Sequence, residues 1–147
     1  THSLLHACAM AGMDMAVATP AGYECAPEIV AEAKEIAKRT GSKITITHDP
    51  VEAISDSDAV YADTWVSMGQ EAEKAKRIEI FKPYQINAEL FAKAKSDAIF
   101  LHCLPAYRGY EVTEDVIDGP QSVIFDEAEN RLHAQKAIMT MVMGNLK

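Results

Sequence analysis

The chain has 147 residues, a formal net charge of −8 and 48% hydrophobic residues. These values predict one soluble globular domain, which buries roughly two-thirds of the surface of its unfolded chain and needs no disulfide staples. The acidic balance argues against nucleic acid as a partner, and the absence of any apolar run near roughly 18 residues argues against a membrane span. The three cysteines, Cys8, Cys25 and Cys103, are odd in number and widely spaced, which favours a reducing, cytoplasmic setting.

The first part of the chain alternates between helical and extended patterns. Apolar residues that recur at helical spacing predict helices, and short β-branched or apolar runs predict strands. Pro27 opens one of the helices, because proline is favoured at the first helical position. We expect a helix from 4 to 12, a strand from 14 to 19, a helix from 27 to 40, a strand from 43 to 47, a brief helix from 50 to 54 and a strand from 58 to 62.

The second part of the chain continues the alternation after a polar loop from 63 to 70. Helices are expected from 71 to 81 and from 87 to 95, broken at Pro83, then a strand from 97 to 101, a short helix from 113 to 118, a last strand from 122 to 125 and a closing helix from 129 to 147. Such alternation predicts an α/β fold in which residues 1–147 form one domain: a three-layer, doubly wound, mainly parallel sheet with helices on both faces, as in Rossmann-like folds.

Two polar loops follow strands that are expected to be neighbours in this sheet. Parallel strands bring the loops at their carboxyl ends to one edge, so residues 63–69 and 102–109 should share a site. In the first loop, Asp63 could hold an ammonium group through a charge-assisted hydrogen bond. The alternative is that Asp63 and Ser67 only cap the turn and the helix that follow.

The second loop combines an imidazole, a thiol and a proline. Cys103 could be a nucleophile, a polar contact for a ligand, or an inert buried residue, because a cysteine beside a histidine is a weak sign of catalysis by itself. The bond from Leu104 to Pro105 is a candidate for the cis form, although only about 5% of such bonds adopt it. Arg108 is more typical of an ion-paired turn than of a binding site.

Three segments in this order closely resemble the ornithine carbamoyltransferase family: 63–71, 102–109 and 127–131. The resemblance covers nearly the whole chain and is to the second, ornithine-binding domain of that two-domain enzyme, with its closing helix. It implies transfer of a carbamoyl group from carbamoyl phosphate to L-ornithine, which gives citrulline and phosphate in arginine biosynthesis or the urea cycle. It also implies that neither a metal nor an organic cofactor takes part, and that the whole enzyme forms trimers or their multiples.

The resemblance also assigns roles to individual residues. The implied substrate-binding residues are Asp63, Ser67, Met68, His102 and Leu104. The implied catalytic residues are Cys103, between the ornithine amine and the carbamoyl group, and Arg131, on the carbamoyl oxygen. A fixed guanidinium suits that oxygen because it supplies donors where negative charge develops. The resemblance also favours a cis bond between Leu104 and Pro105.

The sequence departs from the family by lacking the carbamoyl-phosphate domain, with its phosphate-binding loop. We therefore expect this chain to lack turnover by itself. A binding or assembly module without turnover is one alternative. A carbamoyltransferase for putrescine or an acylated ornithine is another, which the loop from Ser67 to Gly69 disfavours. His2 and His6 have the spacing of a metal-binding pair on a helix, but no third ligand follows at usable spacing, so no metal site is expected.

Overall fold

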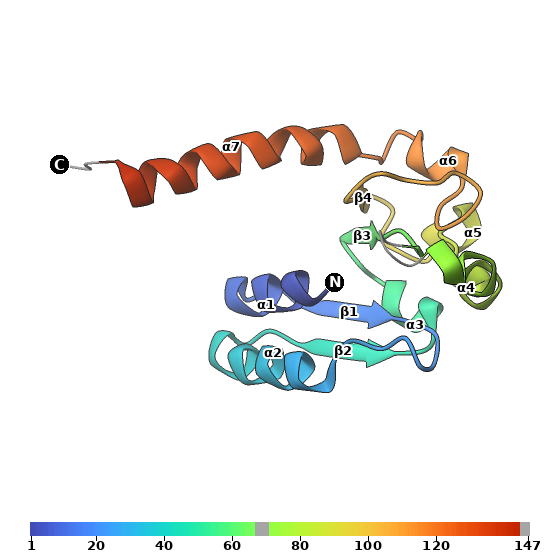
Figure 1. The fold of residues 1–147 in the computed structure, drawn as a ribbon, viewed down its shortest axis with the longest axis horizontal. Helices are drawn as coiled ribbons and strands as arrows, with labels where there is room; N and C mark the ends of the chain where they lie inside the picture. The colour runs from blue at the N-terminus through green and yellow to red at the C-terminus, as the bar shows by residue number, and fades with distance from the viewer. Residues whose placement is uncertain (67–70, 145–147) are drawn as a thin grey trace.

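The computed structural model describes residues 1–66 and 71–144, which form an α/β fold of short parallel strands and helices (Figure 1). The α-helices and strands are, in chain order, α1 (His2–Ala11), β1 (Met15–Ala18), α2 (Pro27–Thr40), β2 (Ile44–Thr47), α3 (Pro50–Ile54), β3 (Ala59–Ala62), α4 (Lys74–Phe81), α5 (Ala88–Phe91), β4 (Ile99–His102), α6 (Glu114–Ile117) and α7 (Ile124–Met143). Two 3-10 turns, Glu71–Glu73 and Lys82–Tyr84, flank α4. The predicted fold class is confirmed.

The strands pair in two parallel two-stranded sheets, β1 with β2 and β3 with β4, where we had expected one sheet. Each sheet has its own apolar core. The core of the β1–β2 half contains Leu5, Ala9, Val17, Cys25, Ala33, Ala37 and Ile44. The core of the β3–β4 half contains Ile54, Val60, Ala62, Ile86, Phe100, Val112, Val116, Ile117 and Ile124.

Local sequence explains where the helices of the β1–β2 half begin and end. The helix α2 begins at Pro27, and both α1 and α2 end at a glycine in the left-handed region, Gly12 and Gly41. The N–H of Gly41 donates to the carbonyl of Ala37, which satisfies one of the last carbonyl groups of the helix. The sequence therefore sets the ends of α2 as we expected.

The strand expected from 122 to 125 is wrong. Ser122 makes a single isolated bridge to Phe100, and α7 already begins at Ile124, five residues before the expected start of the closing helix. A short apolar run does not distinguish a strand from the buried end of a helix. Here Asp126 and Glu127 follow Ile124, and carboxylates are favourable in the first turn of a helix.

The two helices expected after the first polar loop are shorter than predicted. The helix expected from 71 to 81 begins with a 3-10 turn, and α4 starts only at Lys74. The helix expected from 87 to 95 is limited to α5, whose first turn is capped by Asn87. Pro83 lies in a 3-10 turn between them, as expected for a residue that interrupts a helix.

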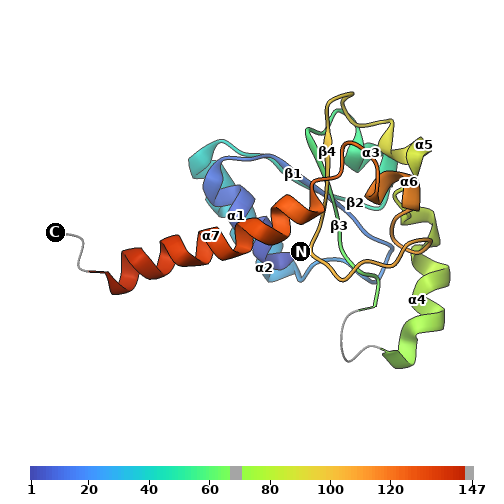
Figure 2. The same ribbon diagram turned by 90° about the horizontal axis from the view of Figure 1, so that it is seen from above.

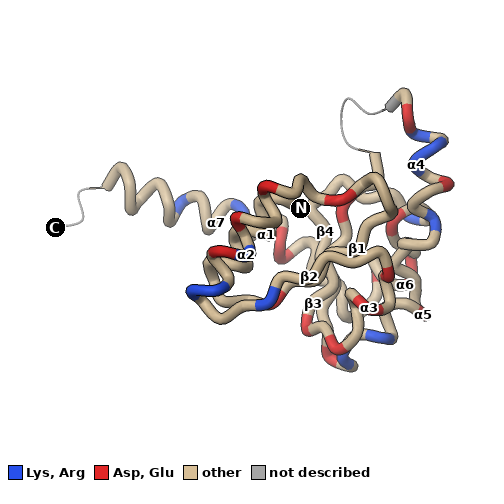
Figure 3. The backbone as a smooth tube through the Cα atoms, turned by 90° about the horizontal axis from the view of Figure 1, so that it is seen from below, with Lys and Arg blue, Asp and Glu red and all other residues tan. Residues whose placement is uncertain are grey.

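The long helix α7 leaves the body of the molecule as a rod (Figures 1 and 2). Its far half carries few charges, as Figure 3 shows, and exposes apolar side chains that include Ile138, Met141, Val142 and Met143. No helix in the described part of the chain is both long and apolar enough to cross a membrane.

Candidate functional site

Asp63 and Cys103 lie side by side at the carboxyl ends of β3 and β4. The parallel register pairs Ala62 with His102, so the next residue on each strand reaches the same edge. The Sγ atom of Cys103 donates a hydrogen bond to Oδ1 of Asp63 at 3.1 Å, and the N–H of Thr64 donates to the same oxygen at 2.8 Å. The expected meeting of the two polar loops is therefore present.

The surroundings of Cys103 keep its side chain in the thiol form. Partial burial of the sulfur, in a residue that is otherwise exposed, and the neighbouring Asp63 carboxylate raise the pKa of Cys103 to about 11. At neutral pH the sulfur is a hydrogen-bond donor and only a trace is thiolate, the form that acts as a nucleophile. The geometry thus favours the polar contact over the nucleophile among the alternatives for Cys103.

His102 is buried beneath this edge and contacts the protein on both ring nitrogens. Its Nδ1 accepts the N–H of Leu104 at 2.9 Å, so the proton of the neutral ring is on Nε2, which lies 3.1 Å from Oε1 of Glu111. The same Oε1 accepts the N–H of Tyr107. His102 is 1% exposed, so its imidazole supports the loop, whereas we had expected it to contact substrate directly.

The loop after β4 has the backbone that the family resemblance favoured. The peptide bond between Leu104 and Pro105 is cis. Leu104 has a φ of 53°, which is uncommon for a residue with a side chain. Its hydrogen bond to His102 Nδ1 holds this conformation, and Leu104 lines the edge of the pocket beside Cys103.

A pocket of about 310 Å³ lies over the Asp63–Cys103 pair. Its walls combine the rings of Trp65 and Tyr110, stacked with centroids 6.5 Å apart, with the ammonium of Lys74. The Nζ atom of Lys74 lies 5.6 Å from the Tyr110 ring centroid and 5.8 Å from that of Tyr107, within the range of a cation–π contact. The pocket therefore presents a carboxylate, an ammonium and aromatic faces to a small ligand.

Of the remaining residues of the predicted site, Ser67 and Met68 lie outside the described residues. Arg131 is on the exposed part of α7, beyond the residues that line the pocket. Arg108, expected to be ion-paired, donates two hydrogen bonds to the Asp118 carboxylate at 2.7 and 2.6 Å.

Sequence reasoning missed Glu111 and the role of Glu127. Glu111 is 2% exposed and holds both His102 and Tyr107; its signal is a carboxylate directly before the apolar Val112. The Oε2 atom of Glu127 accepts the N–H of His102 at 3.0 Å, and nothing in the local pattern distinguishes this carboxylate from a solvated one.

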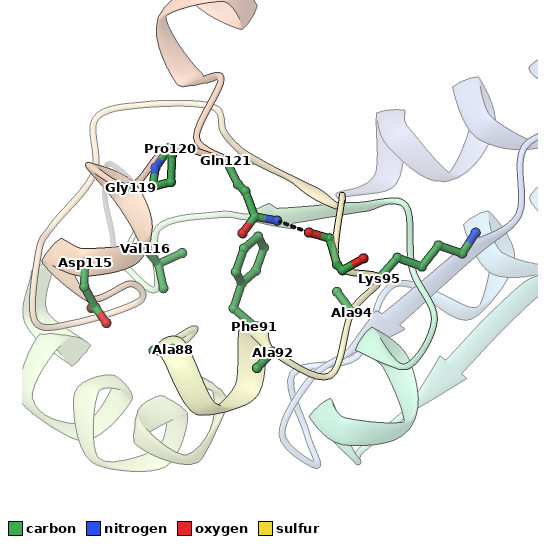
Figure 4. Close-up of a pocket in the computed structure, with 11 residues that line it drawn as sticks. Ala88, Phe91, Ala92, Ala94, Lys95, Asp115, Val116, Gly119, Pro120 and Gln121 are labelled. Carbon is green, nitrogen blue, oxygen red and sulfur yellow. Dashed lines mark hydrogen bonds between the residues drawn. The ribbon is translucent and has the colours of Figure 1, made fainter.

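A second cavity, of about 430 Å³, lies away from the Asp63–Cys103 edge (Figure 4). It is bordered by Phe91 on α5, Val116 on α6 and Gln121, whose amide donates to the carbonyl of Ala98 at 2.6 Å. Within residues 1–66 and 71–144 no cluster of three or more histidine, cysteine or acidic side chains is arranged to hold a metal ion.

Comparison with known proteins gives consistent matches over almost the whole chain. The family model "Aspartate/ornithine carbamoyltransferase, Asp/Orn binding domain" matches residues 1–142. An ornithine carbamoyltransferase of Caldicellulosiruptor saccharolyticus is 63% identical over 140 residues, which are 95% of this chain and 46% of that protein. The chain thus spans about half the length of such a relative.

Solved structures agree with the sequence matches. The ornithine carbamoyltransferase of Pyrococcus furiosus superposes with a TM-score of 0.93 at 52% identity, over 99% of this chain and 47% of that one. An acetylornithine transcarbamylase solved with acetylcitrulline superposes with a TM-score of 0.83 at 31% identity, over 96% of this chain and 43% of that one. The fold is therefore shared with enzymes whose names differ in the amine that they carbamoylate.

Proposed function

Because this chain belongs to the aspartate/ornithine carbamoyltransferase family, we propose that it is the ornithine-binding half of an ornithine carbamoyltransferase. The observation that carries the proposal is the thiol of Cys103 donating to Asp63 inside a pocket of about 310 Å³. This volume is at the small end of the range for ligand pockets, which suits an amino acid. The presence of both Asp63 and Lys74 suits a ligand that carries both signs of charge.

The proposed reaction joins the side-chain nitrogen of ornithine to the carbonyl carbon of carbamoyl phosphate. The new C–N bond forms as the bond from that carbon to the phosphate oxygen breaks, phosphate leaves, and the attacking nitrogen loses a proton. An alkyl amine with an ordinary pKa near about 10.4 is protonated at neutral pH, so the site must favour its neutral form. The neutral thiol of Cys103 can contact the amine as a polar group, and the proposed reaction forms no covalent bond between Cys103 and the substrate.

In this proposal each residue has a separate task. The carboxylate of Asp63 holds an ammonium group of the amino acid, and Ser67 and Met68, in the loop that follows, also bind the amino acid. Cys103 and the backbone of Leu104 lie between the amine and the carbamoyl group. Arg131 donates to the carbamoyl oxygen, and one such contact lowers the barrier by about 3 kcal/mol in other enzymes. His102 and Glu111 support the loop from beneath.

The proposal extends to the whole protein. Carbamoyl phosphate binds mainly to the half of the relatives that this chain does not match, so turnover requires that half. We also propose a cytoplasmic enzyme that assembles as a trimer or a multiple of it, in line with the family resemblance. Sedimentation of the whole protein tests the assembly: a monomer at micromolar concentration would contradict it.

Titration calorimetry with L-ornithine tests whether the chain binds ornithine as proposed. We expect binding by the chain and a loss of about 10- to 100-fold in affinity for Asp63→Asn, since a hydrogen bond to a charged group contributes about 1.5 to 3 kcal/mol. Asp97→Asn is the matched control, because Asp97 is an exposed carboxylate near the opposite end of β4 and should change nothing.

A chimera tests turnover. It supplies the half of the Caldicellulosiruptor saccharolyticus relative that this chain does not match, and citrulline should form only when that half is present. No binding of ornithine together with no citrulline from the chimera would contradict the proposal. Carbamoylation of Nα-acetylornithine in preference to ornithine would instead favour the second substrate class, that of the acetylornithine relative.

A further inference from the structure

The helix α7 is fixed to the domain near its start. The N–H of Val123, which precedes the helix, donates to the carbonyl of Phe100 on β4 at 3.0 Å, and Ile124 is buried in the core of the β3–β4 half. Among the described residues of α7 after Ile124, every one is exposed except Glu127, which is half-buried. The first turn therefore decides in which direction the rest of the helix points.

Glu127 joins this first turn to β4 and lies near β3. Its Oε2 accepts the N–H of His102, the last residue of β4, at 3.0 Å. Burial and the nearby Glu127 carboxylate raise the pKa of Tyr61 on β3 well above its usual range. One carboxylate thus contacts the strand residue directly before Cys103 and lies near the residue two positions before Asp63.

Arg131 lies one turn beyond Glu127 on the same helix. Residues four apart in a helix share a face and are about 6 Å apart along the axis. The face that Glu127 turns toward the ends of β3 and β4 is therefore the face that carries Arg131. Any rotation or tilt of the first turn moves the Arg131 guanidinium relative to the Cys103 thiol.

We propose that Glu127 is a positioning residue, whose carboxylate holds the first turn of α7 against the end of β4 and so sets the direction in which the helix carries Arg131. The inference deepens the proposed function and rests on it, because Arg131 needs this direction only if it serves carbamoyl transfer. Glu127 itself touches no reacting atom. Its task is to accept hydrogen bonds, which a neutral amide oxygen can also do.

This distinction makes glutamine the decisive substitution. Glu127→Gln keeps an oxygen that accepts from His102 and loses the negative charge, whereas Glu127→Ala loses both. Asp126→Ala is the matched control, because Asp126 is an exposed carboxylate in the same helical turn. Tyr61→Phe removes the hydroxyl group near Glu127 and leaves the contact of Glu127 to His102. It should lower kcat less than Glu127→Ala does.

The experiment measures citrulline formation by the chimera described above and amide hydrogen exchange at His102. For Glu127→Ala we expect kcat to fall by about 10- to 100-fold, with KM for ornithine changed less than threefold, and faster exchange at His102. Glu127→Gln and Asp126→Ala should remain within about threefold of the unsubstituted chimera in kcat and should keep the slow exchange. Circular dichroism confirms that each variant is folded.

Three outcomes separate the possibilities. Unchanged kcat and unchanged exchange in Glu127→Ala would overturn the inference. A loss in Glu127→Gln as large as in Glu127→Ala would also overturn it, because the charge would then be the required feature. If the unsubstituted chimera makes no citrulline, the proposed function fails and the positioning of Arg131 for that reaction falls with it, while exchange at His102 still shows whether Glu127 anchors α7.

Discussion

The two halves of the molecule bury different kinds of groups. The core of the β1–β2 half is made of small and aliphatic side chains and one cysteine, and its two longer helices end at glycines. The β3–β4 half buries His102 and Glu111 among its apolar residues and holds Leu104 at a positive φ. Both halves contain a parallel strand pair, yet only the second carries the pocket over Asp63 and Cys103.

The difference shows where this fold departs from regular structure. A buried carboxylate is costly unless it is hydrogen-bonded, and Glu111 meets that requirement with His102 and the N–H of Tyr107. These contacts hold the loop that presents Cys103. Among its described residues the β1–β2 half buries no histidine or charged side chain, and His48 and Glu24, which pair with each other after β2 and β1, are exposed.

The largest effect is expected from breaking the buried pair of the β3–β4 half. His102→Ala removes a hydrogen bond to the buried Glu111 carboxylate, which keeps the Tyr107 N–H as its remaining contact, and it leaves a cavity where the ring was, so we expect the free energy of unfolding to fall by about 3 to 5 kcal/mol. Urea unfolding at pH 7 measures the change. His102→Ala combined with Glu111→Ala should cost less than the sum of the two single variants. A loss below about 1 kcal/mol for His102→Ala would contradict the role of the pair.

A truncation in the other half should cost stability without reaching the site. Leu5 is fully buried in the core of the β1–β2 half, and Leu5→Ala should lower the free energy of unfolding by about 2 to 5 kcal/mol. Ornithine affinity of the folded protein should stay within about twofold, as measured by calorimetry well below the unfolding temperature. Loss of ornithine binding in a folded Leu5→Ala variant would show that the two halves are not separable in this way.

A smaller effect is expected on the chemical reactivity of the Cys103 thiol. Its pKa of about 11 lies above the usual value of about 8.5, so alkylation by iodoacetamide should accelerate as the pH rises toward 11. Asp63→Asn removes one cause and lowers the pKa of Cys103, while burial, the larger cause, remains. At pH 8 we expect alkylation of Cys103 about three- to tenfold faster, since more thiolate of lower intrinsic reactivity forms.

Peptide mass spectrometry distinguishes Cys103 from Cys8 and Cys25 in this assay. Asp97→Asn should leave the rate unchanged. An equal rate in Asp63→Asn and the unsubstituted chain at every pH would mean that the Asp63 carboxylate does not influence the sulfur.

The smallest effect concerns a helix cap in the β3–β4 half. Oδ1 of Asn87 accepts the N–H of Leu90 at 2.9 Å at the start of α5, and Asn87→Ala should cost about 1 kcal/mol. Thermal unfolding measures this, with Asn87→Asp as the variant that keeps an acceptor. Asn87→Asp should retain the stability that Asn87→Ala loses, which would show that the β3–β4 half depends on this side-chain acceptor. An equal loss in both variants would contradict the role of the cap.

Regular structure could be predicted from sequence where local signals agree. The bounds of α2 follow from Pro27 and Gly41, and β2 follows from its β-branched residues. The meeting of Asp63 and Cys103 could also be predicted, because it depends only on parallel neighbouring strands and the position of each residue after its strand. These inferences use neighbours in sequence and one rule of topology.

Tertiary contacts decided the features that sequence reasoning missed. Residues 122–125 look like a strand, but Ile124 enters the core as the start of a helix. The family resemblance implied that His102 binds substrate, whereas alternation along β4 turns its ring inward to Glu111, nine residues later. Such a partner is found only when the loop between the two residues has a known path.

The attachment of α7 at its root makes the helix a lever. With a rise of about 1.5 Å per residue, Arg131 lies about 10 Å from Ile124, whereas the far end lies almost 30 Å away. A swing of about 10° at the root displaces the far end by about 5 Å but Arg131 by less than 2 Å. Because Arg131 lies near the root of α7, a small change in the direction of the helix displaces its guanidinium much less than it displaces the far end of the helix.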